Sequence, residues 1–251
     1  MPDEIRVLPV RGLPEVRPGD DLGALIARAL AEHGPELADG DVVVVAQKVV
    51  SKAEGRLVSL RTVEPSPLAR AFAAEYGKDA RQVEVVLREA RRIVRMERGV
   101  LIVETRHGFV CANAGVDASN VAGEEVVSLL PLDPDASAER LRRQLEAATG
   151  CRLAVIISDT FGRPWREGQT NVAIGVAGMS PFRSYIGQRD PYGYELRVTN
   201  LCVADEIAGA AELVMGKVSA VPVAVVRGVQ PAEGEGGARA IVRPAERDLF
   251  R

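Results

Sequence analysis

The sequence has few cysteines, few histidines and no long apolar run. Its cysteines, Cys111, Cys151 and Cys202, are an odd number without a CxxC pair, which argues against a disulfide framework or a thiolate zinc site and fits a reducing cytoplasm. Only His33 and His107 are present, so a histidine-based catalytic triad or a multi-histidine metal site is nearly excluded. No segment approaches the roughly 20 apolar residues that cross a bilayer, and the N-terminus lacks the basic and apolar regions of a signal peptide. We therefore expect a cytoplasmic protein with no membrane partner.

Basic residues are not in excess either. The 251 residues carry a formal net charge of -3 and are 27% charged and 47% hydrophobic, which is typical of a globular protein. A chain with this balance has no general footprint for DNA or RNA, so we expect no nucleic-acid partner. The length allows a substantial core. We expect a single domain over residues 1–251, with two lobes that meet near residues 80–90 as the alternative.

Periodic apolar patterns predict a mixture of strands and helices. Strands are predicted at residues 5–10, 41–52, 152–159, 171–179 and 221–228, with three more between 93 and 113 joined by tight turns. Helices are predicted at residues 21–33, 67–77, 80–92, 137–149 and 200–215, the first capped by Asp20 and the fourth by Ser137. Hairpins and helices alternate irregularly, without a βαβ rhythm. This favours an α+β fold with mixed and antiparallel sheets and flanking helices over a doubly wound sheet.

Polar residues follow three of the predicted apolar strands, where loops on a rigid sheet commonly bind ligands. The sets are Gln47, Lys48 and Lys52; Asp117 and Asn120; and Asp159 with Thr160. The aspartates and the threonine offer hard oxygen ligands, which suit Mg²⁺ or Mn²⁺, and Lys52 suits a phosphate. Together they resemble the parts needed for phosphoryl transfer. No GxxxxGK(S/T) motif occurs, so the fold is not expected to be of the P-loop type.

Each of these residues also has a simpler interpretation. Asp117 and Asp159 could be turn or cap residues, a role that aspartate often has beside glycine or at a strand end. Lys52 and Arg166 could be ordinary solvated charges. The residue types alone leave both interpretations open.

Four long motifs, in order along the chain, resemble the coenzyme F420-0:L-glutamate ligases: VVSKAEGR, FVCANAGVDASNV, IISDTFGRPWREGQTNVAIGVAG and AELVMGKVSAVPVAVVRG. The resemblance runs from GLPEV to VVRG, nearly the whole chain. It implies an enzyme that adds L-glutamate to coenzyme F420-0, and further γ-linked glutamates, with GTP as co-substrate, Mg²⁺ or Mn²⁺ as the metal and K⁺ as a helper ion. It also implies an α+β fold, distinct from ATP-grasp, that forms a homodimer. Some relatives carry a nitroreductase-like C-terminal domain, which we do not expect here.

The resemblance also assigns site residues. It assigns catalytic roles to Asp117, Asp159 and Lys52, and metal ligation to Asp117, Asp159 and Thr160. GTP contacts fall on Leu13, Pro14, Glu15, Val16, Gln47, Lys48, Lys52, Asn120, Met215, Gly216 and Lys217. The chain departs from the family in two places: Gln47-Lys48 stands where small hydroxyl residues are common, and Lys217 stands where a neutral or acidic group is expected.

Other assignments rest on charge type alone. Arg163, Arg166, Arg183 and Arg189 are candidates to hold the acidic substrates, and Glu54 is a candidate general base. Two other functions stay open: a nucleotide-dependent amide ligase for another carboxylate acceptor, and a non-catalytic GTP-binding regulator.

Overall fold

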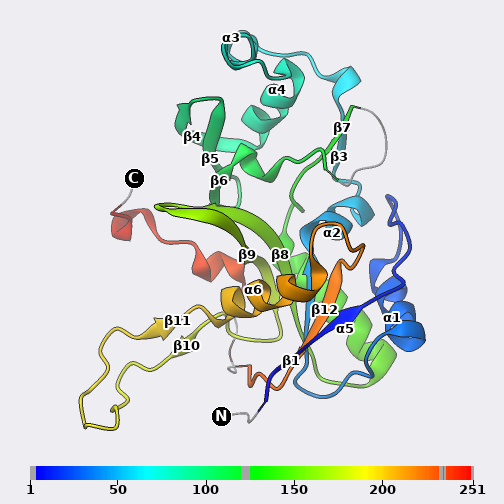
Figure 1. Ribbon diagram of the computed structural model, residues 1–251, viewed down its shortest axis with the longest axis vertical. Coiled ribbons are helices and arrows are strands. Elements are labelled where there is room, and N and C mark those ends of the chain that lie inside the picture. Colours follow the sequence, from blue (N-terminus) through cyan, green and yellow to red (C-terminus); the bar gives the residue numbers. More distant parts are fainter. Residues whose placement is uncertain (1–3, 120–124, 232–233, 235, 250–251) are drawn as a thin grey trace.

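The computed structural model describes residues 4–119, 125–231, 234 and 236–249. Its centre is a five-stranded sheet with the strand order β1-β12-β2-β8-β9 (Figure 1). The strands are β1 (Arg6–Val10), β12 (Val223–Arg227), β2 (Val42–Ala46), β8 (Ala154–Arg163) and β9 (Arg166–Ala177). Strands β2 and β8 run parallel, and the other neighbouring pairs of this sheet are antiparallel. The predicted α+β fold with a mixed sheet is therefore confirmed.

Helices pack on both faces of this sheet. Helices α1 (Leu22–His33) and α5 (Pro134–Thr149) share a core with one face, and α6 (Val203–Met215) shares a core with the other. The valines of β2 are fully buried because alternate side chains enter the two cores. Val43 and Val45 belong to the core under α1 and α5, and Val44 belongs to the core under α6. This strand is therefore fixed from both sides.

A third core lies apart from the central sheet. It joins helices α3 (Pro67–Tyr76) and α4 (Ala80–Glu89) to strands β4 (Ala90–Glu97) and β5 (Val100–Thr105), and β6 (Val110–Ala112) completes this smaller sheet. Figure 1 shows these elements at one end of the molecule, reached through the antiparallel pair β3 (Leu57–Ser59) and β7 (Val126–Ser128). The three strands predicted between residues 93 and 113 are confirmed, with their tight turns.

The remaining elements are short. They are α2 (Gln47–Ala53), β10 (Arg183–Ser184), β11 (Asn200–Leu201) and the 3₁₀ turns η1 (Leu60–Thr62), η2 (Asn113–Gly115), η3 (Ala238–Ile241) and η4 (Ala245–Arg247). Strands β10 and β11 form the base of an arm that extends away from the body of the molecule (Figure 1). Within the described ranges, none of the helices combines the length and the apolar character that a membrane crossing requires.

Two predicted helix caps were wrong, and each correction has a local cause. Helix α1 is capped by Asp21, whose carboxylate accepts the Ala24 N–H at 3.1 Å, whereas Asp20 accepts the Arg17 N–H and closes the preceding turn. Helix α5 begins earlier than predicted because Asp133 is its cap and Pro134 occupies the first turn, a position that proline favours. Ser137 therefore lies inside the helix, where its hydroxyl donates to the backbone oxygen of Asp133.

The predicted strand over residues 41–52 is also wrong in its second half. Strand β2 ends at Ala46, and the chain turns directly into α2. Gln47, Val50 and Ser51 are buried at helical spacing, which the apolar pair at positions 49–50 had concealed. Strand β8, in contrast, continues past its predicted end at residue 159 to Arg163, and pairs with β9 as a long hairpin.

Candidate functional site

A cavity of about 960 Å³ opens where β2 ends beside the middle of β8. The two strands run parallel, and the last residue of β2, Ala46, pairs with Ser158 of β8; both residues line the cavity, and β8 continues beyond them to Arg163. Its volume is in the upper part of the range common for ligand sites. Among the residues that line it are those assigned above by resemblance, except Asn120, which lies outside the described residues: Leu13, Pro14, Glu15, Val16, Gln47, Lys48, Lys52, Asp117, Asp159, Thr160, Met215, Gly216 and Lys217.

An unusual turn positions Asp117. Asn113, Ala114 and Gly115 follow β6 with φ angles of 53°, 54° and 69°, so three successive residues adopt the left-handed region. This conformation is costly for residues other than glycine and is commonly kept at functional sites. A Cβ on Gly115 would also lie 2.7 Å from Cδ2 of Leu130. The turn delivers Asp117 to an isolated bridge with Ser128, beyond the strand, rather than to a strand end as predicted.

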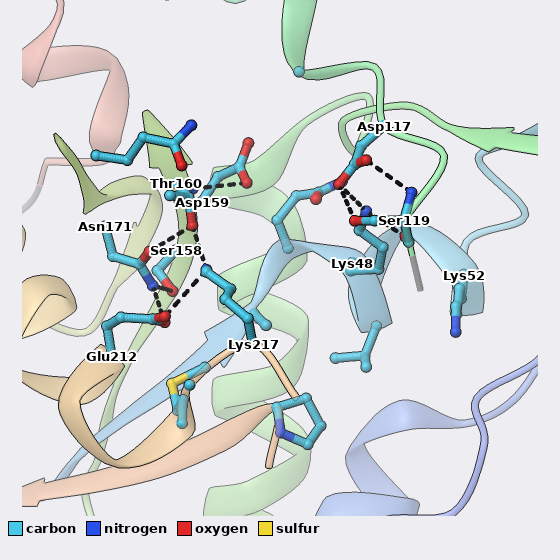
Figure 2. Close-up of a pocket in the computed structure, with 18 of the residues that line it drawn as sticks. Lys48, Lys52, Asp117, Ser119, Ser158, Asp159, Thr160, Asn171, Glu212 and Lys217 are labelled. Carbon is cyan, nitrogen blue, oxygen red and sulfur yellow. Dashed lines mark hydrogen bonds and ion pairs between the residues drawn. The ribbon is translucent and has the colours of Figure 1, made fainter. Parts of the chain in front are cut away.

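Asp117 is held by Lys48 and Ser119 (Figure 2). The Lys48 ammonium lies 2.5 Å from Oδ2 of Asp117, and the Ser119 hydroxyl donates to the same oxygen at 2.7 Å. The Ser119 N–H donates to Oδ1 at 2.8 Å. Burial acts to raise the pKa of Asp117, but the hydrogen bonds from Lys48 and Ser119 outweigh it, so the pKa lies below its usual value. Asp117 is therefore ionised at neutral pH.

Asp159 has a different environment, deep in the cavity and within β8 rather than at its end. Its Oδ1 accepts the Thr160 N–H at 2.8 Å, and the described part of the chain gives it no ion pair. Burial raises the pKa of Asp159 to about 6, although that N–H and the charges of Lys48 and Lys217 act to lower it. The charge of Asp117 acts to raise it further. The two carboxylates are therefore close enough to influence each other.

A ring of polar contacts surrounds Thr160 on the other side of Asp159 (Figure 2). The Thr160 hydroxyl donates to Oδ1 of Asn171 at 2.7 Å, and Nδ2 of Asn171 donates to Glu212 at 3.0 Å. The Lys217 ammonium closes the ring, with 2.5 Å to Oγ1 of Thr160 and 3.2 Å to Glu212. Lys217 reaches this place because Gly216, at φ 60° and ψ -176°, ends α6 in a conformation that favours glycine.

Helix α2 supplies the opposite wall. Lys52, whose side chain is 9% exposed, lies 2.6 Å from the Glu15 carboxylate. Gln47 is buried and donates from Nε2 to the Ser51 hydroxyl at 2.6 Å and to the Leu129 oxygen at 3.1 Å. Lys48 and Lys52 are both on this helix, four positions apart, and both line the cavity. Lys52 was predicted to lie at the end of a strand, but it lies in helix α2.

The oxygen donors around Asp159 fit a hard divalent cation. No group of three or more His, Cys, Asp or Glu side chains comes together within the described ranges. A metal would therefore rely on Asp117, Asp159 and Thr160 together with water and substrate oxygens, the way in which Mg²⁺ is usually held. Burial raises the pKa of Asp159, and a cation bound there would stabilise its charged form.

Several predicted residues lie elsewhere. The residues that line the cavity do not include Arg163, Arg166, Arg183 or Arg189. Glu54 contacts Ser137 and Arg140 in a separate cavity of about 150 Å³, so the structure does not support it as the base of this site.

The sequence assigned no role to three further residues of the cavity. Asn171 and Glu212 complete the ring on Thr160, and Ser119 holds Asp117. Ser119 stands in the polar cluster after β6, which was a usable signal. Glu212 gave no signal, because an acidic residue on an amphipathic helix is ordinary.

The fold and this cavity define an α+β protein with a large cavity lined by lysines and carboxylates. Residues 12–228 match the family model described as F420-0:Gamma-glutamyl ligase. The chain belongs to this family and is accordingly an enzyme of the ligase class.

Full-length relatives support the same family. The chain is 49% identical, over 250 residues, to a protein of Methanothermobacter thermautotrophicus named coenzyme F420:L-glutamate ligase, with 98% of this chain and 99% of the relative covered. A protein of the same name from Methanopyrus kandleri is 49% identical, with 98% of both chains covered. A third, from Archaeoglobus fulgidus, is 46% identical, with 98% of this chain and 96% of the relative covered.

Proposed function

We propose that this chain joins L-glutamate to coenzyme F420-0, with GTP as the source of energy. One observation carries the proposal. The described residues that the family resemblance assigns to nucleotide and metal line one cavity of about 960 Å³, although they come from positions 13 to 217 of the chain. A set of independent turn or cap residues has no reason to converge in this way. The relatives named above carry the same activity in their names.

The nucleotide is proposed to bind between α2 and the turn after α6. Lys52 and Lys48 on α2, and Lys217 after Gly216, present ammonium groups to the cavity. An ammonium is a compact point charge that suits phosphate oxygens. Gln47, held by Ser51 and Leu129, fixes the start of α2. Guanine in place of adenine is a proposal from the family resemblance.

A Mg²⁺ or Mn²⁺ ion is proposed to be held by Asp117, Asp159 and Thr160. When bound, it would neutralise charge on the transferred phosphoryl group. The chain's own contribution is to hold the oxygen donors in a partly buried site, where charge interactions are stronger than in water. Ser119 orients Asp117 through two hydrogen bonds, and the Thr160 N–H orients Asp159.

The chemistry must activate a free carboxylate, which is a poor electrophile. In the proposed route the acceptor carboxylate attacks the γ-phosphorus of GTP, so that GDP leaves and an acyl phosphate forms. The amine of L-glutamate then attacks the acyl carbon, loses a proton and expels phosphate, which leaves an amide. Besides the two aspartates, Glu15 and Glu212 are carboxylates that line the cavity, and we propose them as candidates to accept that proton.

The test is a reconstituted reaction. Purified protein is mixed with GTP, Mg²⁺ or Mn²⁺, K⁺, L-glutamate and coenzyme F420-0, and products are identified by mass spectrometry as each component is omitted in turn. We expect a glutamyl adduct and GDP only when GTP, metal, glutamate and acceptor are all present. Adducts on other acids, with none on F420-0, would instead assign a different acceptor. GTP binding without phosphate release in the complete mixture would point to a regulator.

A further inference from the structure

The ammonium groups of two lysines contact oxygen atoms that are proposed as ligands of the metal. The Lys48 ammonium lies on Asp117 at 2.5 Å and also reaches the Ser119 backbone oxygen at 2.9 Å. The Lys217 ammonium lies on the Thr160 hydroxyl at 2.5 Å. Figure 2 shows these as two separate groups, with Asp159 beside the second. Asp159 itself has no ion pair among the described residues, yet the charges of both lysines act on it.

These contacts are incompatible with a metal on the same oxygens. A divalent ion lies about 2 Å from its oxygen ligands. An ammonium on the same oxygen would then be within roughly 4 Å of the ion, where like charges repel strongly in a partly buried site. Lysine stems are flexible, so the ammonium groups can move while the carboxylates stay. Metal entry therefore requires both ammonium groups to leave.

The displaced ammonium groups can contact the phosphates of a nucleotide bound in the same cavity. Lys48 and Lys217 both line the space in which the nucleotide is proposed to bind, from opposite walls. An ammonium that leaves a carboxylate gains most by meeting another anion, and phosphate oxygens are the strongest acceptors that the proposed substrates bring. One divalent ion would replace two singly charged groups, Lys48 at Asp117 and Lys217 at Thr160 and Glu212, so the local charge is kept.

We propose that Lys48 and Lys217 are exchange cations: they occupy the metal's oxygen ligands in the metal-free protein and pass to the nucleotide phosphates when the metal binds. The inference rests on the proposed function for the metal and the nucleotide. It makes metal and nucleotide binding mutually favourable, because the metal frees the groups that the nucleotide needs and the nucleotide removes the groups that compete with the metal.

The first experiment measures Mn²⁺ binding to nucleotide-free protein by electron paramagnetic resonance and calorimetry. Lys48→Met and Lys217→Met keep the stem and remove the competing charge. Each should tighten Mn²⁺ binding about tenfold or more, the effect of one charge-assisted contact. Lys52→Met is the matched control: it removes the same charge from the same cavity, but its ammonium lies on Glu15 and on no metal ligand. We expect it to change Mn²⁺ affinity by less than about threefold, since a more distant charge is screened.

The second experiment measures the coupling between the two ligands. GTP affinity is determined with and without Mn²⁺, and the ratio is the coupling factor. The wild type should show tighter GTP binding with metal, and this factor should shrink toward one in Lys48→Met and Lys217→Met. In Lys52→Met, GTP should bind more weakly with and without metal while the factor stays. Lys48→Gln and Lys217→Gln serve if a methionine variant does not fold.

Several results would overturn the exchange. Unchanged or weaker Mn²⁺ binding in both variants would make the lysines structural, especially if melting temperatures fall. If Lys52→Met tightened Mn²⁺ binding equally, the effect would come from the loss of positive charge in the cavity and not from the contacts of Lys48 and Lys217. Failure of every variant to bind Mn²⁺ would also end the proposal. The product assay measures the ligase activity separately, so a failure of the exchange can be distinguished from a failure of the proposed function.

Discussion

The ammonium of Lys48 lies 2.5 Å from Oδ2 of Asp117, although 69 positions separate the two residues. Lys48 belongs to the helix that follows β2 of the central sheet, and Asp117 belongs to the segment that follows β6 of the smaller sheet. The contact therefore connects the two sheets across the cavity. The site exists only when both are folded against each other, which explains why its residues are so scattered in the sequence.

Lys52→Ala should weaken GTP binding more than it raises the KM for glutamate. The Lys52 side chain is 9% exposed and faces the cavity beside Glu15, where a triphosphate gains from its charge and glutamate offers no such group. Loss of a charge-assisted contact costs about 1.5–3 kcal/mol, a tenfold to hundredfold effect. Calorimetry for GTP and steady-state kinetics for glutamate check this. Equal losses for both ligands would indicate a folding defect instead.

Arg227→Met should destabilise the fold without involving the site. Arg227 makes two hydrogen bonds, of 2.8 Å and 2.6 Å, to the Asp41 carboxylate, which is 1% exposed. Removing the guanidinium leaves a buried charge without its partner, which costs about 3 kcal/mol. Urea unfolding measures the change, and Arg6→Met, which removes an exposed pair with Glu4, is the control that should leave stability unchanged. Equal stability of the two variants would contradict the prediction.

Much of the fold was predictable because its signals are local. Buried strands such as β2 and β12 are continuous apolar runs, and α3, with Ser66 as cap and Gly77 at its end, has both termini written in the sequence. Predictions failed where adjacent residues compete for one role, as Asp20 and Asp21 do at the start of α1. The turn from β2 into α2 was missed because two neighbouring valines suit either structure.

The site was predictable only in part, for a different reason. Asp117, Asp159 and Lys52 stand out as polar residues after apolar runs, and their convergence in one cavity agrees with that interpretation. Their partners do not stand out. Glu212 joins Lys217 and Asn171 only through the packing of α6 on the sheet, a contact across 41 positions in the case of Asn171. Long-range side-chain pairing leaves no periodic signal in a single sequence.

Two copies of the chain should associate through the smaller sheet. Ile93, Val100 and Val110, one on each of its strands, are 38%, 44% and 39% exposed. Covering such side chains is favourable, and the family resemblance implies a homodimer. Light scattering after gel filtration at micromolar concentration should give twice the 26.8 kDa chain mass. Val110→Lys should shift the protein toward the monomer, whereas Leu213→Lys on α6 should not. A monomeric wild type would refute this.

Asp159→Asn should stabilise the metal-free protein, and more so as pH rises. Burial raises the pKa of Asp159 from 3.8 to about 6, so the folded state binds this proton more tightly than the unfolded state. The ionised carboxylate therefore costs no stability below pH 4, a growing amount up to pH 6, and a constant amount above it, on the order of 2–3 kcal/mol. Unfolding with EDTA from pH 4 to pH 8 tests this. The pKa of Asp117 is lowered instead, so we expect Asp117→Asn to destabilise the metal-free protein. If Asp159→Asn raised the free energy of unfolding by the same amount at every pH, this explanation would be wrong.

Asp117 and Asp159 should behave as one metal site. Asp117→Asn and Asp159→Asn should each abolish most glutamate transfer while both variants stay folded, because an amide keeps the size and loses the charge that binds a hard cation. The double variant should be hardly worse than either single one, since residues that serve one ion are not additive. Turnover and melting temperature are measured for the three variants while Mn²⁺ is titrated.

The alternative, that the two aspartates only shape turns, leads to a different pattern. The Ser119 contacts of Asp117 and the Thr160 contact of Asp159 are local hydrogen bonds of the kind that caps and turns make. Independent turn residues would each cost about 1 kcal/mol of stability, would add in the double variant, and would leave turnover largely intact. Near-normal turnover in either single variant would defeat the metal assignment for that residue. Loss of turnover that high Mn²⁺ partly restores would support it, because a weakened site still fills at high concentration.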